Sequence, residues 1–477
     1  MPKTLWNRGF VALLITQFTV AFNDNVFRWL LIPIGKAYAL TTAGEDGIRF
    51  LGAFFLVVPF LLWASIAGYV TDRFSRRTTV IWCKTVELFL LAAGAAVIAL
   101  GPNVADSTGM PIKIYLLLGI LFLLGSQSAL FSPSKYGLIP DLVPTTSISA
   151  ANGVMMMLTM LAIVSGTVVG GYVFAWTTLF HDVYNACGIL ERLPYDNAIP
   201  GGQHIWITVL VLVGVAAIGL LTSFFIPKMD AVDPNAKFPK NPFLQTGKDI
   251  ATLFSHKALF WVAIASAFFW GLAALAQINI DKYAIEFLMV PQEDVGPLVA
   301  ILTIGIGIGA IICGILSGKR IELGLVPIGA FVVGVFILFL GFTPGHTTEI
   351  GRGFGSPFDS PYIFAAIVMF LVGLGAGLYD VPLAAYIQKN SPKAQRGRML
   401  AAYNFCTFTS VIIFSGLGLL GAIVFGQLSE HPSLMVWIAT GLLTLSVCAV
   451  LVYLYAAPLK SFVFRTLRIA QPNDEVE

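Results

Sequence analysis

The chain has 477 residues, of which 57% are hydrophobic and 11% are charged, and its mean hydropathy is +0.85. Soluble domains carry about 25% charged residues, so this composition excludes a soluble enzyme, a nucleic-acid-binding protein and a disordered scaffold. The 28 lysines and arginines against 25 acids give a net charge of +3, which is too small to indicate a polyanionic partner. The five cysteines form no CxxC pair, so we expect neither a disulfide framework nor a metal site.

Apolar stretches long enough to cross a bilayer recur along the whole chain. A bilayer core about 30 Å thick needs roughly 20 apolar residues in a helix, and these runs are continuous rather than alternating as in a membrane β-barrel. The N-terminal stretch carries no cleavage signal, so we expect the first span to be retained. We predict an all-α membrane protein with twelve transmembrane helices, near residues 10–38, 50–71, 78–100, 112–133, 148–180, 204–227, 258–289, 297–317, 324–343, 361–387, 398–426 and 433–457.

The basic residues are divided unequally between the two sides of this predicted bundle. Most of the 28 fall in the loops on the side that also carries both termini. Because lysine and arginine are enriched in cytoplasmic loops, we expect both termini to be cytoplasmic. The basic residues expected on the outer side are Lys36, Arg49, Lys113, Arg192 and Arg352, and those expected within spans are Arg28, Lys84 and Lys282.

A polar, lysine- and proline-rich stretch separates two sets of six predicted spans, and the two sets resemble each other. Ala150-Ala151-Asn152 in the first set is similar to Ala401-Ala402-Tyr403-Asn404 in the second. Such similarity at about half the chain length indicates two parallel, pseudo-symmetric repeats around a central path. The predicted division is an N-terminal six-helix half at 1–227, a cytoplasmic linker at 228–257, a C-terminal six-helix half at 258–460 and a cytoplasmic tail at 461–477.

The loop after the second predicted span carries a recognisable motif, Gly68-Tyr-Val-Thr-Asp72-Arg73-Phe-Ser-Arg76-Arg77. It resembles the signature loop of the major facilitator superfamily, Gly-x-x-x-Asp-Arg-x-Gly-Arg-Arg/Lys, with a serine in place of the second glycine. Glycine permits close helix approach, and the aspartate can accept hydrogen bonds from the N-terminus of a neighbouring helix. The corresponding stretch in the second half, Gly314-Ile-Leu-Ser-Gly318-Lys319-Arg320-Ile-Glu322, lacks the aspartate, and Glu322 is its nearest acid. We predict an inner gate made of Gly68, Asp72, Arg73, Arg76, Arg77 and Glu322.

Three further stretches narrow the resemblance. They are Asn23-Asp24-Asn25, Ser132-Pro-Ser-Lys135-Tyr136-Gly137 and Ser391-Pro-Lys-Ala-Gln-Arg396-Gly397-Arg398. Together they resemble the bacterial lysophospholipid transporter family, and also the transporter portion of lysophospholipid acyltransferase fusion proteins. The resemblance implies a transporter that flips lysophosphatidylethanolamine-like lipids across the bacterial inner membrane by alternating access. The resemblance to single-function members implies an arginine in the seventh span, where this sequence has Gln277, which looks more like the fusion branch.

Charged side chains within the predicted spans are the candidates for a binding site, because each costs about 2.5–3.5 kcal/mol at a helix centre on insertion scales. Asp24 and Arg28 are one helical turn apart and close enough to pair. We interpret them as a headgroup site, where Asp24 meets an ammonium and Arg28 a phosphate; a self-neutralised structural pair is the alternative. For Glu87 and Asp380 a structural role fits equally well. The predicted substrate-binding residues are Asp24, Asn25, Arg28, Glu87, Lys135, Gln277, Asp281 and Lys282.

Two other functions remain open at this point. One is a proton- or sodium-coupled carrier of a soluble solute or drug, and the other is a non-transporting membrane subunit that docks a soluble acyltransferase. The sequence contains neither a His-x-x-x-x-Asp acyltransferase motif nor a phosphate-binding Gly-x-x-x-x-Gly-Lys-Ser/Thr loop. We therefore expect no enzyme activity, no ATP and no cofactor. The expected partners are a lysophospholipid and membrane lipid, with a separate acyltransferase left open and no nucleic acid, and the expected state is a monomer.

Overall fold

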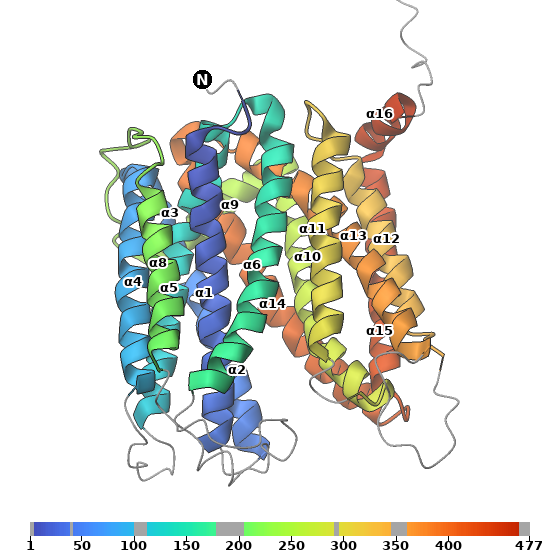
Figure 1. Cartoon of the computed structure of the whole chain (residues 1–477). Helices are drawn as coiled ribbons and strands as arrows, with labels where there is room; N and C mark the ends of the chain where they lie inside the picture. Colours follow the sequence, from blue (N-terminus) through green and yellow to red (C-terminus); the bar gives the residue numbers. More distant parts are fainter. Residues whose placement is uncertain are drawn as a thin grey trace, which may run out of the picture.

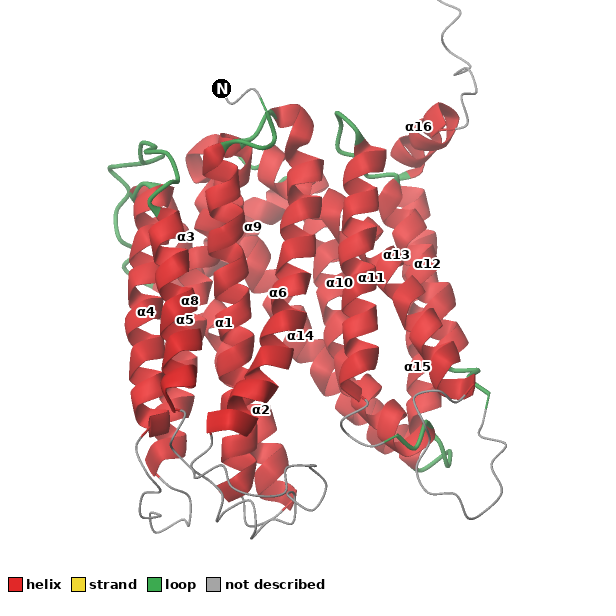
Figure 2. Cartoon of the chain, viewed as in Figure 1, coloured by secondary structure: helices red, strands yellow, loops and turns green. Residues whose placement is uncertain are grey.

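The computed structural model describes residues 4–38, 42–99, 112–177, 205–290, 295–344 and 360–466, and these ranges are helical apart from short connections (Figures 1 and 2). Arg192, Arg352 and the predicted tail beyond residue 466 lie outside them. Helices satisfy their backbone groups internally, as a lipid environment requires. They are α1 (Arg8–Tyr38), α2 (Thr42–Leu62), α3 (Ala64–Arg73), α4 (Arg76–Ala99), α5 (Ile112–Leu142), η1 (Thr145–Ser147), α6 (Ile148–Thr177), α8 (Ile205–Ser223), α9 (Pro242–Ser255), α10 (Lys257–Lys282), η3 (Tyr283–Phe287), α11 (Val295–Ser317), α12 (Leu325–Leu340), α13 (Ser360–Asn390), η5 (Lys393–Gln395), α14 (Arg396–Gly426), α15 (Pro432–Leu454) and α16 (Ala456–Thr466).

Long apolar helices dominate the described part of the chain. Ten of them are long and apolar enough to cross a membrane, the pair α2 and α3 forms an eleventh candidate, and α12 is a shorter apolar helix of 16 residues. Each stretch predicted from the sequence overlaps one of these elements, so the all-α membrane fold is confirmed. The count of twelve spans stays a prediction because α12 falls short of a full crossing length.

The second predicted span is broken rather than continuous. α2 and α3 meet at an angle of 61°, and Trp63 lies between them with a non-helical backbone conformation. Pro59 lies one turn before the break, where its ring removes a helix donor. The indole N–H of Trp63 donates to the hydroxyl of Ser126 at 2.9 Å, which fixes the corner against α5. The first part of the motif that follows the corner, Gly68 to Arg73, is thereby carried on its own short helix, α3, and Arg76 and Arg77 begin α4.

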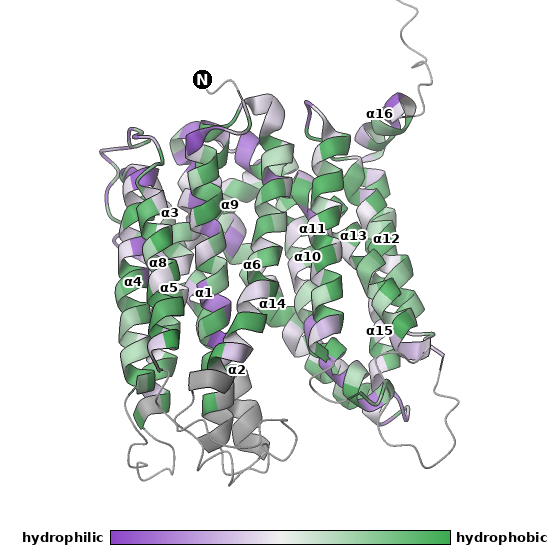
Figure 3. Ribbon diagram, viewed as in Figure 1, coloured by the Kyte–Doolittle hydropathy of each residue, from purple (hydrophilic) through white to green (hydrophobic). Residues whose placement is uncertain are grey.

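The helices form two groups that pack side by side (Figure 1). The first group comprises α1 to α6 and α8, and the second comprises α10 to α15. The first turn of α1 and the helix α16 lie at the same end of the bundle, which we call the N-terminal end, and the ribbons of the two groups diverge toward the other end. Figure 3 shows the helices mostly hydrophobic along their length, with polar residues in the loops of the N-terminal end.

The stretch predicted as a linker contains a helix, α9, that lies against both groups. α9 packs against α3 of the first group and against α10 and α14 of the second. The hydroxyl of Ser65 in α3 donates to the carbonyl of Pro242 at 2.8 Å, and the side chain of Asn241 caps the helix by accepting from the N–H of Leu244. The domain division at 228–257 stays a prediction.

Candidate functional site

The two helix groups are joined at the N-terminal end by a carboxylate that caps a helix. Asp72 at the end of α3 accepts hydrogen bonds from the backbone N–H of Gly397 at 2.8 Å and of Arg398 at 3.1 Å. These are the first free donors of α14, where the helix dipole favours a negative charge. A Cβ atom on residue 397 would lie 2.6 Å from Oδ1 of Asp72, and one on residue 68 would lie 2.9 Å from Cα of Arg398. Glycine at both positions therefore permits this contact.

A second ionic contact lies beside the first. Arg76 of α4 forms an ion pair with Asp141 of α5, and Arg396 of α14 approaches the other oxygen of Asp141 at 3.3 Å. Both arginine side chains are largely buried. One carboxylate thus holds two cations that come from different helix groups.

Close packing of α6 on α11 closes the same end on another side. Here a Cβ on Gly153 would collide with the carbonyl of Ala310, and a Cβ on Gly314 would lie 3.1 Å from Cα of Ala150. Next to this contact, the amide side chains of Asn152 and Gln388 exchange two hydrogen bonds of 2.9 and 2.7 Å across the groups. Small residues at these positions bring the two backbones together.

Two of the remaining residues predicted for the gate, Arg77 and Glu322, have their partners elsewhere. Arg77 donates to the carbonyl of Phe224 at 3.0 Å, beside the C-terminus of α8. Glu322 forms an ion pair of 2.7 Å with Arg465 of α16. Arg73 is partly buried in the last turn of α3. The structure therefore brings Gly68, Asp72 and Arg76 together against α14, and their role as a gate stays a prediction.

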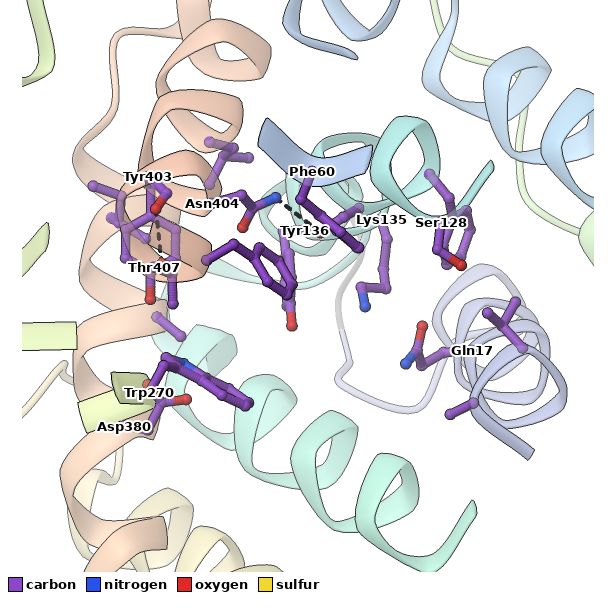
Figure 4. Close-up of a pocket in the computed structure, with 18 of the residues that line it drawn as sticks. Gln17, Phe60, Ser128, Lys135, Tyr136, Trp270, Asp380, Tyr403, Asn404 and Thr407 are labelled. Atoms are coloured by element: carbon purple, nitrogen blue, oxygen red, sulfur yellow. Dashed lines mark hydrogen bonds between the residues drawn. The ribbon is translucent and has the colours of Figure 1, made fainter. Parts of the chain in front are cut away.

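A cavity of about 220 Å³ lies between the two groups, below this closed end. Figure 4 shows Gln17, Ser128 and Lys135 on the side of the first group and Trp270, Asp380 and Tyr403 on the side of the second. The cavity is lined by α1, α2, α5, α10, α13 and α14, and its wall includes Gln17, Asp24, Phe60, Ser128, Ser132, Lys135, Tyr136, Trp270, Asp380, Gln388, Tyr403, Asn404, Thr407 and Phe408.

The wall contributed by the first group holds polar atoms without partners. Asp24 accepts a hydrogen bond from the Ser128 hydroxyl at 3.3 Å through Oδ2, while its buried Oδ1 has no partner among the described residues. The amide N–H of Gln17 donates to Thr159 at 3.2 Å, and its carbonyl oxygen is likewise buried without a donor. Buried acceptors of this kind are costly unless a donor is supplied, so both call for a hydrogen-bond donor from a ligand or a bound water.

Lys135 supplies a cation to the same wall. Its Nζ lies 4.4 Å from the centre of the Tyr136 ring and 5.7 Å from that of Phe131. Asp24 attracts it electrostatically, but no carboxylate of the described residues forms an ion pair with it. The cavity therefore presents an ammonium group and unsatisfied acceptors side by side.

The wall contributed by the second group is built around Asp380, which the sequence interpretation left between a structural and a functional role. The Ser266 hydroxyl donates to Oδ1 of Asp380 at 3.3 Å, and the indole N–H of Trp270 is a further donor to this carboxyl. The Ser266 and Tyr403 hydroxyls are also hydrogen-bonded to each other. Asp380 is 4% exposed, so it lies in the wall rather than in open solvent.

Glu87 is not part of the cavity wall. Both of its carboxylate oxygens accept hydrogen bonds from Nζ of Lys84, at 2.8 and 2.7 Å, and both side chains are completely buried. Nζ of Lys84 also lies 3.4 Å from the hydroxyl of Thr19 on α1. The partner of Glu87 is thus on its own helix, three residues away, and the pair reaches α1 through the contact of Lys84 with Thr19.

Asp24 and Arg28 do not pair with each other in the structure. The carboxylate that attracts Arg28 is Asp281 of α10, across the two groups. Asn25 donates to the carbonyl of Ala21 within α1 at 2.7 Å. Gln277 is exposed, and Asp281 and Lys282 are partly buried. Of the predicted binding residues, the structure places Asp24 and Lys135 at the cavity and leaves Asn25, Arg28, Glu87, Gln277, Asp281 and Lys282 outside its wall.

Several wall residues were not predicted as binding residues from the sequence. Phe60 and Phe408 stack with ring centres 3.9 Å apart across α2 and α14, and Asn404 donates to the Ser132 hydroxyl at 2.9 Å across α5 and α14. Aromatic and amide side chains are common in apolar helices, so only the assembled fold identifies them. In the described part of the chain no three histidine, cysteine, aspartate or glutamate side chains cluster as metal ligands would.

A helical membrane bundle with a polar cavity between two helix groups, closed at one end by contacts between those groups, is the architecture of a membrane transporter. The chain belongs to the Major Facilitator Superfamily, whose family model matches residues 13–415. This confirms the superfamily resemblance seen in the sequence.

Similar proteins of named function and known structure agree with this assignment. The chain is 24% identical over 426 residues to the lysophospholipid transporter LplT of Shigella boydii serotype 4 (88% of this chain, 90% of the relative) and 23% identical over 429 residues to that of Salmonella gallinarum (88% and 90%). Its fold is similar to the crystal structure of the Major Facilitator Superfamily transporter FucP in the outward conformation (TM-score 0.64, 15% identity, 97% and 98% covered) and to a bacterial homologue of the iron transporter ferroportin in an outward-facing state with soaked iron (TM-score 0.62, 13% identity, 93% and 98% covered).

Proposed function

We propose that this protein moves lysophospholipids of the lysophosphatidylethanolamine type across the bacterial inner membrane by alternating access. The observation that carries the proposal is the pair of complementary groups in one cavity wall, Asp24 with an unsatisfied oxygen and Lys135 without an ion-pair partner among the described residues. A zwitterionic headgroup presents the matching ammonium and phosphate. The names of the relatives in Shigella and Salmonella support the substrate class.

The headgroup assignment differs from the one that the sequence suggested. Asp24 and the carbonyl oxygen of Gln17 would accept from the ammonium, whereas Lys135 rather than Arg28 would meet the phosphate, because Lys135 lines the cavity and Arg28 does not. Each contact would replace a missing one, so binding would relieve the cost of the buried acceptors.

An apolar helix beside the cavity supports a lipid substrate. In the most apolar stretch of α14, 6% of the residues are buried, against 28 to 72% in the other spans of the described chain. Beyond the Phe60–Phe408 stack the exposed side chains of α14 include Ile412, Ile413 and Leu417. An acyl chain could lie along this surface and remain in an apolar environment while the headgroup occupies the cavity.

The orientation of the cycle follows from the charge distribution. With both termini cytoplasmic, as the basic loops indicate, the end closed by Asp72 would face the cytoplasm and the cavity would receive substrate from the outer side. Opening of the Asp72 contact would then release the headgroup inward.

The test measures inward movement of labelled lysophosphatidylethanolamine in vesicles that contain the purified protein. Loss of a hydrogen bond to a charged group costs about 1.5–3 kcal/mol, so we expect Asp24→Asn and Lys135→Met each to lower the initial rate about tenfold or more. Ser446→Ala, which removes a hydroxyl on the exposed side of α15, is the matched control and should keep the wild-type rate. Vesicles without protein-dependent movement, or full activity of both cavity variants, would refute the proposal.

A carrier of a soluble solute is the second candidate, and one observation favours it. At the level of the cavity the flank between α2 and α14 is closed by the Phe60–Phe408 stack. A flank closed by aromatic rings suits a substrate that lacks an acyl chain. Competition for the labelled lysolipid by its glycerophosphoethanolamine headgroup alone would support this candidate, whereas competition that requires the acyl chain would support the lipid.

A further inference from the structure

Asp380 is a buried acid in the cavity wall that takes no part in the proposed headgroup contacts. It lies on α13, 4% exposed, and its immediate partners are neutral donors, the Ser266 hydroxyl and the Trp270 indole N–H from α10. Four titratable groups interact with it electrostatically, and all four are uncharged at neutral pH. They are Tyr136 of α5, Cys313 of α11, Tyr379 of α13 itself and Tyr403 of α14.

No cation balances this acid within the described residues. None of the ion pairs there involves Asp380, and α6 and α12, which also pack against α13, add no charged group to its surroundings. Asp24 differs in this respect, because Lys84, Lys135 and Glu87 all act on it, so that two acids and two cations balance. A lone carboxylate at this depth is costly, whereas its protonated form is neutral.

The surroundings of Asp380 also depend on the contact between the helix groups. Tyr136 comes from the first group and follows Ser132 and Lys135 on α5. The same stretch of α5 is tied to α14 by the hydrogen bond from Asn404 to Ser132 at 2.9 Å. Separation of the groups at the N-terminal end would break this bond and withdraw Tyr136, so that Asp380 would become accessible to water from that side.

We propose that Asp380 is a proton-binding site that couples transport to a proton gradient. The carboxylate takes a proton from water on the side to which the cavity is open. The neutral carboxyl is carried through the change of conformation, and the proton leaves to water on the opposite side, which regenerates the carboxylate. This coupling goes beyond the proposed substrate, because it applies equally to a soluble solute.

The test compares wild type and Asp380→Asn in vesicles, with labelled lysolipid and an imposed pH gradient. For one proton per substrate, a gradient of one pH unit shifts the equilibrium distribution about tenfold. We expect the wild type to respond to the gradient and to lose that response when a protonophore is added. In Asp380→Asn the ratio of the rates with and without the gradient should fall to about one, whatever the absolute rate. Glu430→Gln, which removes an exposed acid between α14 and α15, is the matched control and should respond as the wild type does.

Two further measurements keep the inference testable, because the first needs no variant of Asp380 and the second needs no substrate. A pH-sensitive dye inside the vesicles should report proton movement that accompanies the lysolipid. The infrared spectrum of the purified protein should show a buried protonated carboxyl, which disappears in Asp380→Asn and returns in Asp380→Glu. Lysolipid movement without proton movement, a response to sodium alone, or a gradient response retained by Asp380→Asn would overturn the inference. If lysolipid does not move but the carboxyl band is present, the proposed substrate is overturned and the proton site stands.

Discussion

At the scale of single residues, Lys84 and Glu87 show why charge can persist inside a membrane bundle. The two side chains are completely buried and joined by two hydrogen bonds, so the pair is neutral as a whole. Neither charge would be tolerated alone, because removal of one partner of a buried ion pair leaves an uncompensated charge.

We therefore predict that Lys84→Met destabilises the protein by about 3–5 kcal/mol. The measurement is thermal or denaturant unfolding in detergent, with Lys84→Met/Glu87→Leu as the second variant. Removal of both charges should restore most of the lost stability, since no unpaired charge remains. Equal stability of the single variant and the wild type would contradict this account.

The sequence predicted some of these residue contacts and not others, for a physical reason. Asp72 was predictable because its loop follows a superfamily motif and because a carboxylate caps a helix N-terminus in a known way. Glu87 has its partner three residues away, at a spacing that helical periodicity could have revealed. The partners of Asp380 lie on other helices. Ser266 is on α10, more than a hundred residues earlier in the chain, and Tyr403 is on α14, later in the chain, so these surroundings became visible only in the assembled fold.

At the scale of helices, glycine controls how closely α6 and α11 approach. Gly153 faces the carbonyl of Ala310, where a side chain has no space, whereas Gly171 farther along α6 has nothing within 4 Å of its would-be Cβ. Substitutions at these two positions of one helix therefore distinguish an effect on packing from an effect on helix propensity.

We predict that Gly153→Ala weakens the contact between α6 and α11 by about 1–3 kcal/mol, the usual cost of overpacking. The readout is the solvent accessibility of a cysteine placed at Ala150, which should rise in Gly153→Ala. Gly171→Ala should leave that accessibility unchanged. If both substitutions changed it equally, the effect would come from the helix and not from the contact.

Element boundaries were predictable as far as hydropathy reports them. Each predicted span overlaps a helix because continuous apolar sequence in lipid leaves helix formation as the way to satisfy the backbone. The bend of 61° between α2 and α3 was not predicted, because Trp63 is as apolar as its neighbours. α9 was not predicted within the polar linker either, since its stability depends on packing against α3 and α14.

At the scale of the whole molecule, the two groups are joined at one end by contacts that the proposed transport cycle would have to break. The reciprocal amide pair of Asn152 and Gln388 joins α6 to α13 within this closed region. Alternating access requires the two groups to move against each other around the cavity.

We predict that cysteines at these two positions, in a background without the five native cysteines, can be cross-linked and that the cross-link abolishes transport. The measurement is lysolipid movement before and after treatment with a short thiol cross-linker, with recovery on reduction of a cleavable reagent. A single Asn152→Cys variant treated in the same way is the control and should keep its activity. Undiminished transport by the fully cross-linked protein would rule out separation of the groups at this end.

The two sides of the contact between Asp72 and α14 differ in how they depend on the amino-acid sequence. On one side it depends on a side chain, and on the other it depends on backbone N–H groups at positions 397 and 398 that every residue except proline provides. A charge swap between partners, the usual way in which an ion pair survives mutation, is therefore not available here. Loss of Asp72 cannot be compensated by a side chain at position 397, because a Cβ there would also lie 2.8 Å from Cβ of Thr71. During evolution the strength of this contact can be tuned from one side alone.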